Sequence, residues 1–272
     1  MKIAFFPYKK IKTKIFFWIT QNEVDAWSRK TNICFILAHG RSGTAFLANL
    51  LNKASGAHIV HEPVTEDFRA YTQAFNCPAK ATRYFHEFRK KEIFLRTYSL
   101  PIETYGEVNS VLRRHAKAIQ ETLPNATLIH LVRDGRDVVR SMYSRKTMTL
   151  QDPVTQHIQP GENDPYWKTW GDMDRFARLC WYWRAENIYL RTTIRRTIQL
   201  EHIIRSYDYL SEYLLEPCHI MLPKRLWREE IGNPQNNTGR YQMAHWRDWT
   251  PEQKRAFSDI CGEEMRKNGY NF

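Results

Sequence analysis

The uninterrupted apolar run 33–38 (ICFILA) leads directly into a turn of small and polar residues. An apolar run without polar alternation is typical of a parallel strand that helices cover on both faces. After the turn, apolar residues recur at helical spacing from Phe46 to Ala54. The order strand, tight turn, helix is therefore predicted for this part of the chain.

The same order returns further along the chain. Residues 128–132 form an apolar run, 133–136 a turn, and apolar positions from Val138 to Tyr143 mark one helix face. Further strands are predicted at 58–60, 93–95 and 198–203, helices at 108–123, 175–195 and 251–267, and a long loop at 147–174. Alternating strands and helices predict an α/β fold: one domain with a central parallel sheet, helices on both faces, and a P-loop-like first turn.

The size and charge of the chain bear on its domain organisation and on its binding partners. The 272 residues, 42% of them hydrophobic, suffice for one large core, so we expect an N-terminal arm at 1–30 and a single domain at 31–272. Lys and Arg number 41 against 29 Asp and Glu, a formal charge of +12, which attracts anionic partners. The apolar stretch 15–19 is too short for a membrane span. The basic and aromatic arm is either a surface segment or a site of peripheral membrane contact.

The cysteines suggest where the protein works. Five of them lie far apart, and none forms a Cys-x-x-Cys pair. This spacing predicts neither a zinc site nor a disulfide framework, so a reducing, cytoplasmic location is expected.

The turn after the first strand has the composition of an anion site. Its residues are Gly40, Arg41, Ser42, Gly43 and Thr44. Glycine lets the backbone approach a ligand closely, and the start of the following helix presents unpaired N–H groups and the positive end of its dipole. The alternative is an ordinary strand–helix turn with a solvated arginine.

The same turn departs from the ATP-binding pattern G-x-x-x-x-G-K-[ST]. Its basic residue precedes the second glycine, and no metal-binding carboxylate accompanies the hydroxyl at Thr44. We therefore expect a nucleotide donor handled without a metal. A magnesium-dependent, kinase-like enzyme remains the alternative reading, and a non-catalytic nucleic-acid or acidic-surface binder is suggested by charge alone.

The second turn adds a further cation. Arg133 follows the strand 128–132, and Ser141 lies about two helical turns beyond it. A guanidinium and a hydroxyl placed in this way can converge on one phosphate. The alternative is a helix N-terminus with incidental charges.

Taken together, these segments resemble a known family. HGRSGTAFLANLL resembles the 5′-phosphosulfate loop, and LIHLVRDGRDVVRSMYSR the 3′-phosphate segment, of sulfotransferases that use 3′-phosphoadenosine 5′-phosphosulfate (PAPS). IQLEHII is similar to a later strand, and HWRDWTPEQKRAFSDICGEEMRKNGY resembles the C-terminal segment of the bacterial and carbohydrate branches. The resemblance spans about 33–270. It implies transfer of a sulfonate group from PAPS to a small-molecule or glycan hydroxyl, with adenosine 3′,5′-bisphosphate as product and no nucleic-acid partner.

The resemblance also implies roles for particular residues. Arg41 matches the cation at the bridging oxygen, and Arg133 and Ser141 match the 3′-phosphate ligands. The residues matching the 5′-phosphate loop are Gly40, Ser42, Gly43, Thr44 and Ala45, the last standing where relatives commonly carry a hydroxyl. Arg240 matches, more loosely, a loop that folds over the 3′-phosphate.

The catalytic base is assigned by the same resemblance. Moving a sulfonate to a hydroxyl needs a proton acceptor, and Glu62 matches the glutamate base of the carbohydrate and tyrosyl-protein branches, with His61 as the alternative. By the same resemblance, Glu62 in the setting His61-Glu62-Pro63 favours a carbohydrate or peptide hydroxyl over a flat phenol as acceptor. Arg96, at the end of the predicted strand 93–95, aligns with a lysine near the sulfonate.

Overall fold

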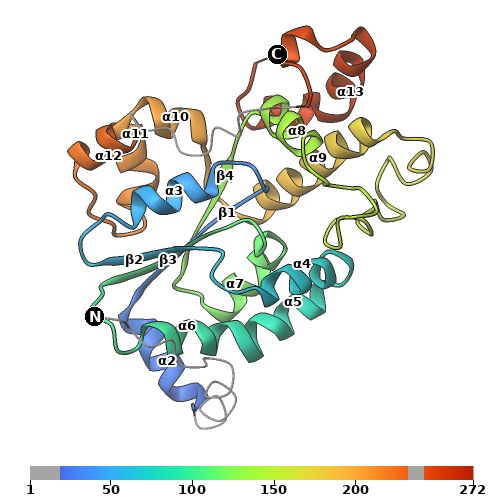
Figure 1. Ribbon diagram of the computed structural model, residues 1–272. Helices are drawn as coiled ribbons and strands as arrows, with labels where there is room; N and C mark the ends of the chain where they lie inside the picture. Colours follow the sequence, from blue (N-terminus) through green and yellow to red (C-terminus); the bar gives the residue numbers. More distant parts are fainter. Residues whose placement is uncertain (1–18, 232–241, 272) are drawn as a thin grey trace, which may run out of the picture.

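The computed structural model describes residues 19–231 and 242–271. A central sheet of five parallel strands runs in the order β2-β3-β1-β4-β5 (Figure 1). The strands are β1 (Asn32–Ala38), β2 (Ala57–His61), β3 (Thr104–Asn109), β4 (Thr127–Val132) and β5 (Thr197–Gln199). From β1 the chain crosses to one side of the sheet, and from β4 it continues to the other. Ligands of open α/β sheets bind beyond the strand ends at such a reversal.

Helices cover both faces of the sheet, as the sequence predicts. Along β1, Cys34, Ile36 and Ala38 point into one core, whereas Ile33, Phe35 and Leu37 point into the other. This alternation explains why the whole strand is apolar. The first face packs against α3 (Thr44–Leu51), α10 (Leu200–Arg205), α11 (Tyr207–Leu210) and α12 (Lys224–Ile231).

The opposite face packs against another group of helices. These are α2 (Gln21–Lys30), α4 (Glu66–Asn76), α5 (Pro78–Tyr84), α6 (Lys90–Thr97) and α7 (Ala116–Thr122). A third core lies beyond the carboxyl end of β4, among α8 (Gly135–Tyr143), α9 (Arg175–Thr193) and α13 (Pro251–Lys267). Between α8 and α9, residues 144–174 hold turns and no helix or strand, as predicted for 147–174.

Two sequence predictions are wrong in the same region. The strand expected at 93–95 lies within helix α6, where Ile93 is buried and Arg96 bonds to Glu92 one helical turn earlier. The helix expected at 108–123 begins only after β3, whose end the prediction overlapped. The strand predicted at 198–203 is also shorter, since its apolar run continues into α10.

Strand β3 escaped prediction because its sequence, TYGEVN, is polar yet wholly buried. Glu107 is the reason. Its carboxylate accepts hydrogen bonds from Arg89 at 2.6 and 2.7 Å, from the Tyr105 hydroxyl at 2.6 Å and from the Asn109 amide at 3.0 Å. Arg89, at the end of the helical segment Phe85–Arg89, and two other residues of β3 therefore satisfy a charge that would otherwise be costly to bury.

The predicted N-terminal arm lies partly outside the described residues, since 1–18 are not among them. Its described end is helix α2, which begins with a capping box between Thr20 and Glu23. Trp27 of α2 packs edge-on against Phe94 of α6, with ring centroids 5.8 Å apart. Over residues 19–231 and 242–271, no helix combines the length and apolar character needed to cross a bilayer.

Candidate active site

The polar turns that follow the parallel strands meet at one edge of the sheet. The turn after β1 holds residues 39–43, β2 is followed by Glu62, β3 by Ser110 and β4 by Arg133. Because β3, β1 and β4 are neighbours, their carboxyl ends open onto a common space. The sheet order therefore brings together residues that are far apart in sequence.

The turn after β1 ends in an uncapped helix. Gly43 precedes α3 with φ +83°, and a Cβ there would stand 2.7 Å from Leu200 Cδ2, so only glycine fits. No side chain caps α3, which leaves its first N–H groups available to a ligand. Arg41 also has positive φ, at 74°, a conformation that costs a non-glycine residue about 1 kcal/mol. Both features fit a loop shaped for an anion.

The turns after β1 and β4 are joined by hydrogen bonds. Arg133 Nη1 donates to the Arg41 carbonyl at 3.1 Å, and Arg41 Nε donates to Ser141 Oγ at 3.0 Å. Arg133 Nη2 also bonds Asp137, at 3.2 Å. The guanidiniums of Arg41 and Arg133 thus lie on one side of the sheet, next to the start of α3.

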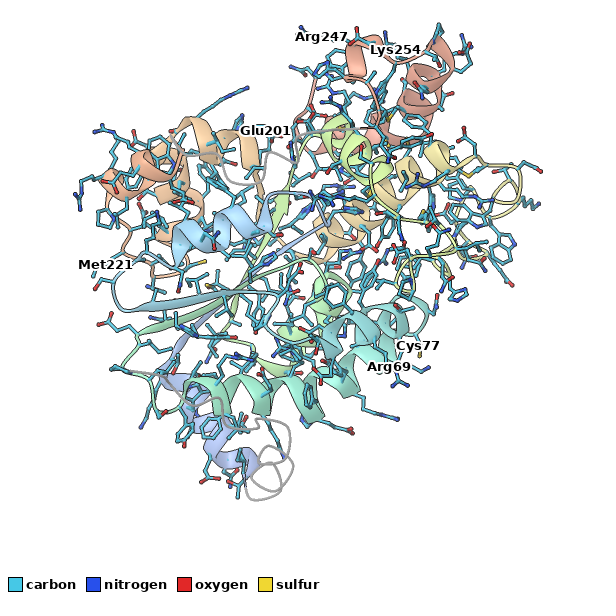
Figure 2. All side chains as sticks on the ribbon, in the orientation of Figure 1. Arg69, Cys77, Glu201, Met221, Arg247 and Lys254 are labelled. Atoms are coloured by element: carbon cyan, nitrogen blue, oxygen red, sulfur yellow. The ribbon has the colours of Figure 1, made fainter. Side chains whose placement is uncertain are left out.

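Helix α10, helix α9 and the C-terminal segment after α13 hold the β4 turn in place. Glu201, labelled in Figure 2, accepts from the Asp134 N–H at 3.0 Å and from the Tyr270 hydroxyl at 2.8 Å. Gly135, the first residue of α8, packs so closely that a Cβ would meet Trp183 at 3.0 Å. The backbone that carries Arg133 is therefore fixed by tertiary contacts.

A cavity of about 250 Å³ opens between the turns. Most of the residues expected from sequence line it: Gly40, Arg41, Gly43, Thr44, Ala45, His61, Glu62, Arg133 and Ser141, together with Phe46 and Ser110. Ser42 does not line it and is buried, and its hydroxyl has no hydrogen-bond partner within the described part of the chain. Arg96 lies outside it on α6, and Arg240 falls outside the described residues.

Glu62 is held in one position at the rim of this cavity. Its φ is +42°, and its carboxylate accepts hydrogen bonds from the Ser110 N–H, at 3.1 Å, and from the Ser110 hydroxyl. His61 Nε2 shares a hydrogen bond of 2.9 Å with Thr44 Oγ1 and lies 3.7 Å from Glu62 Oε1. Glu62 therefore sits beside the loop at the start of α3, within reach of a bound group there.

Ser110 is a site residue that sequence reasoning missed. It lines the cavity and is the hydrogen-bond partner of Glu62. Its position at the end of a parallel strand is the signal that could have identified it. The sequence pattern hides that signal, because it predicts a helix over 108–123.

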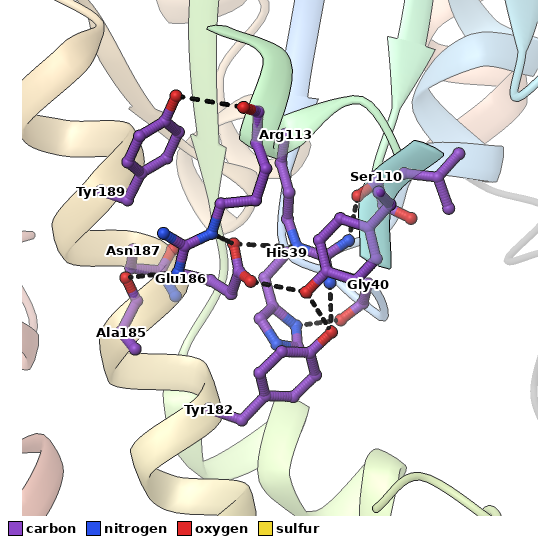
Figure 3. Close-up of polar contacts among 12 residues, drawn as sticks. His39, Gly40, Ser110, Arg113, Tyr182, Ala185, Glu186, Asn187 and Tyr189 are labelled. Atoms are coloured by element: carbon purple, nitrogen blue, oxygen red, sulfur yellow. Dashed lines mark hydrogen bonds and ion pairs between the residues drawn. The ribbon is translucent and has the colours of Figure 1, made fainter. Parts of the chain in front are cut away.

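Beneath Ser110 lies a buried network of charged and aromatic groups (Figure 3). Arg113 donates to the Ser110 carbonyl and to the Tyr182 hydroxyl, and its Nε lies 3.1 Å from Glu186 Oε2. Arg114 Nε bonds the same oxygen at 3.0 Å, and the Tyr71 hydroxyl bonds Oε1 at 2.6 Å. Burial alone would raise the pKa of Glu186, but Arg114 and Arg113 lower it below its usual value. The carboxylate therefore stays ionised and holds Arg113 in place.

His39 is the first residue of the turn after β1, and it is neutral. Its Nδ1 lies 2.7 Å from the Gly40 carbonyl, which can only accept, so Nδ1 carries the proton. Burial, reinforced by the charge of Arg113, lowers the pKa of His39 to about 4. The site shows no sign of a metal centre in the part of the chain that the structure describes. Those residues contain no cluster of three or more His, Cys, Asp or Glu side chains suited to a metal ion.

Comparison with known proteins identifies proteins of similar fold. No family model and no curated protein sequence matches the chain. Among solved structures, sulfotransferase STF9 from Mycobacterium avium gives a TM-score of 0.50 at 10% identity, over 92% of this chain and 82% of that one. A sulfotransferase from Alicyclobacillus acidocaldarius gives 0.48 at 14% identity, over 89% and 97%. Mouse sulfotransferase SULT7A1, complexed with PAP, gives 0.46 at 11% identity, over 92% and 90%. At such identities the likeness concerns architecture alone: the chain has the single-domain α/β fold, built on a parallel sheet, of the Mycobacterium avium protein.

Proposed function

We propose that the protein transfers a sulfonate group from PAPS to an acceptor hydroxyl. The observation that carries this proposal is the joining of the two turns, in which Arg133 bonds the Arg41 carbonyl and Arg41 bonds Ser141. Two guanidiniums and an uncapped helix N-terminus thereby face one cavity. Such an arrangement suits a donor with anionic groups at two points.

In this proposal, each turn binds one end of the donor. The loop Gly40–Ala45, with the N–H groups that open α3, would hold the 5′-phosphosulfate, and Arg41 would stabilise charge on the bridging oxygen. Arg133 and Ser141 would hold the 3′-phosphate. Their present hydrogen bonds to the first loop would then be exchanged for charge-assisted bonds to the donor.

Glu62 is proposed as the general base. Its carboxylate would accept the proton of the acceptor hydroxyl while that oxygen forms a bond to sulfur and the bond from sulfur to the phosphate oxygen breaks. Adenosine 3′,5′-bisphosphate then leaves with the electron pair of the broken bond. His61, whose Nε2 lies 2.9 Å from Thr44 Oγ1, stays the alternative base. Positioning and charge stabilisation would supply most of the acceleration.

Three sequence predictions have less support. Arg96 has no place in the proposed site, because it lies on α6, bonded to Glu92, outside the cavity lining. The role of Arg240 stays a prediction, as that residue is not described. A carbohydrate acceptor is favoured only by the resemblance around Glu62.

The proposal is tested by separating donor binding from turnover. In calorimetry, adenosine 3′,5′-bisphosphate should bind the wild-type protein, and Arg133→Ala should weaken that binding about tenfold or more, since a bond between charged groups is lost. Arg225→Ala, a change at an exposed arginine on α12, serves as the control. Glu62→Gln should bind the bisphosphate normally but transfer sulfonate roughly a hundredfold more slowly. Failure of the wild-type protein to bind the bisphosphate, or its displacement by magnesium ATP, would overturn the proposal.

A further inference from the structure

A second cavity, of about 200 Å³, lies against the first. Gly40, Arg41 and Ser110 line both of them. We propose that this second cavity holds the acceptor, and that the acceptor is a small aromatic alcohol, such as a phenol, in place of a carbohydrate. The inference rests on the sulfonate transfer proposed above and assigns the substrate class of the same site.

The walls of the second cavity are mainly apolar. The side chains of Phe68, Val111, Met142 and Val154 line it, together with the rings of Tyr71 and Tyr182. Phe68, in the first turn of α4, is 41% exposed, so its aromatic surface remains accessible. Apolar walls and aromatic rings favour a ligand that buries hydrocarbon or a ring.

Most of the polar groups on the lining already have partners within the protein. The Tyr71 and Tyr182 hydroxyls lie 2.7 Å apart, and Arg113 bonds Ser110, Tyr182 and Glu186. A sugar has several hydroxyls, and each one buried here without a new partner would cost binding energy. A molecule with one hydroxyl avoids that cost.

The loop that forms the outer wall shows the same internal pairing. Asp152 accepts hydrogen bonds from the Val154 N–H, at 2.9 Å, and from Thr155, whose hydroxyl also accepts from the Met148 N–H at 2.7 Å. Arg175 of α9 fixes the start of the loop by bonding the Thr147 carbonyl at 3.1 Å. The wall is therefore formed in advance, which lowers the entropic cost of binding a rigid ring.

Position completes the argument. Ser110 separates the two cavities and hydrogen-bonds Glu62. A ring in the second cavity would thus direct its single hydroxyl past Ser110 toward Glu62, where the sulfonate is to be received.

The test compares 2-naphthol with methyl β-D-glucoside as acceptors for the full chain, with PAPS as donor. We expect kcat/KM for 2-naphthol to exceed that for the glucoside by about tenfold or more, because its fused aromatic rings bury apolar surface. Phe68→Ala should raise KM for 2-naphthol about threefold to tenfold while leaving the affinity for adenosine 3′,5′-bisphosphate unchanged. Tyr213→Ala, which removes an aromatic of similar exposure (39%) from the segment after α11, should change neither value.

The results separate the proposed acceptor class from the proposed sulfonate transfer. Faster sulfation of the glucoside, or equal effects of Phe68→Ala and Tyr213→Ala, would overturn the acceptor class and leave sulfonate transfer standing. If neither acceptor is sulfated, 2-naphthol is titrated calorimetrically into the protein saturated with bisphosphate. Saturable binding that Phe68→Ala weakens supports the cavity assignment, and its absence refutes it. A wild-type protein that binds no bisphosphate overturns the function itself.

Discussion

Two buried arginine clusters flank the same turn after β3, and they have opposite charge balance. In the first, which we call the Arg113 cluster, Arg113 and Arg114 face a single carboxylate, Glu186. In the second, the Arg89 cluster, one fully buried guanidinium faces three carboxylates: Asp67 at 3.0 Å, Glu92 at 2.5 Å and Glu107 at 2.6 Å. Arg96 adds a partly exposed cation at Glu92.

The difference appears in how the carboxyl groups titrate. Glu186 has a lowered pKa because its two arginines outweigh burial, so the Arg113 cluster keeps its charges at neutral pH. In the Arg89 cluster, burial raises the pKa of Asp67 to about 7, with Arg89 opposing the rise and Glu107 adding to it. The Arg113 cluster, beside the proposed site, thus keeps its charges around neutral pH. The Arg89 cluster gains or loses a proton at Asp67 in that range.

Both clusters reach the turn that carries Ser110. Arg113 bonds the Ser110 carbonyl directly. The Arg89 cluster acts through Asn109, whose amide donates to Glu107 and whose oxygen accepts from the N–H groups of Val111 and Leu112, both at 2.9 Å. The turn that holds Glu62 through Ser110 is therefore fixed by both clusters. The charges of the Arg113 cluster persist at neutral pH, whereas the Arg89 cluster contains a carboxyl group that titrates near neutral pH.

The largest expected effect comes from removing the central cation of the Arg89 cluster. Arg89→Met should lower the free energy of unfolding by about 3–5 kcal/mol, because three buried carboxylates lose their common partner. Arg113→Met should cost less, since Arg114 still pairs with Glu186. Urea unfolding at pH 7 measures both changes. Equal losses in the two variants would show that charge balance does not distinguish the clusters.

The next effect is a change in the pH dependence of stability. Folding raises the pKa of Asp67 from an unfolded value near 3.8 to about 7, so between these pH values the folded state binds the extra proton and stability falls as pH rises. The contribution is at most about 1.4 kcal/mol per pH unit. Asp67→Asn should flatten this slope between pH 4.5 and 7 in urea titrations, whereas Asp208→Asn, at an exposed position, should not. Parallel slopes for Asp67→Asn and wild type would contradict the raised pKa.

The smallest effect tests whether the turn links the clusters to the reaction. Ser110→Ala removes the hydroxyl that bonds Glu62 but retains the backbone N–H bond. Turnover should fall roughly tenfold, at unchanged bisphosphate affinity and with little change in stability, because one bond to a charged group is lost. Ser28→Ala, which removes a bond to a backbone carbonyl on α2, is the control. A variant with wild-type turnover would exclude Ser110 as a positioning group.

The sequence was informative where apolar residues alone determine structure. The runs before Arg41 and Arg133 are buried strands, and the turns after them approach each other as their place at parallel strand ends requires. Strand β3 was missed because Glu107 looks unsuited to a core until Arg89 is seen beside it. Residues 93–95 were misread because three apolar residues fit a helix as well as a strand. Ser110 was lost with β3, since a residue at a strand end is recognised only after the strand.

The partition between the two cavities has a thermodynamic consequence. Gly40, Arg41 and Ser110 contribute a surface to each side, so any shift of this partition when one ligand binds alters the compartment of the other. Linkage then requires the effect to be reciprocal: whatever factor the nucleotide imposes on acceptor affinity, the acceptor imposes on the nucleotide. Under the proposed assignment of the two cavities, any factor other than one would make donor and acceptor binding cooperative, in either direction.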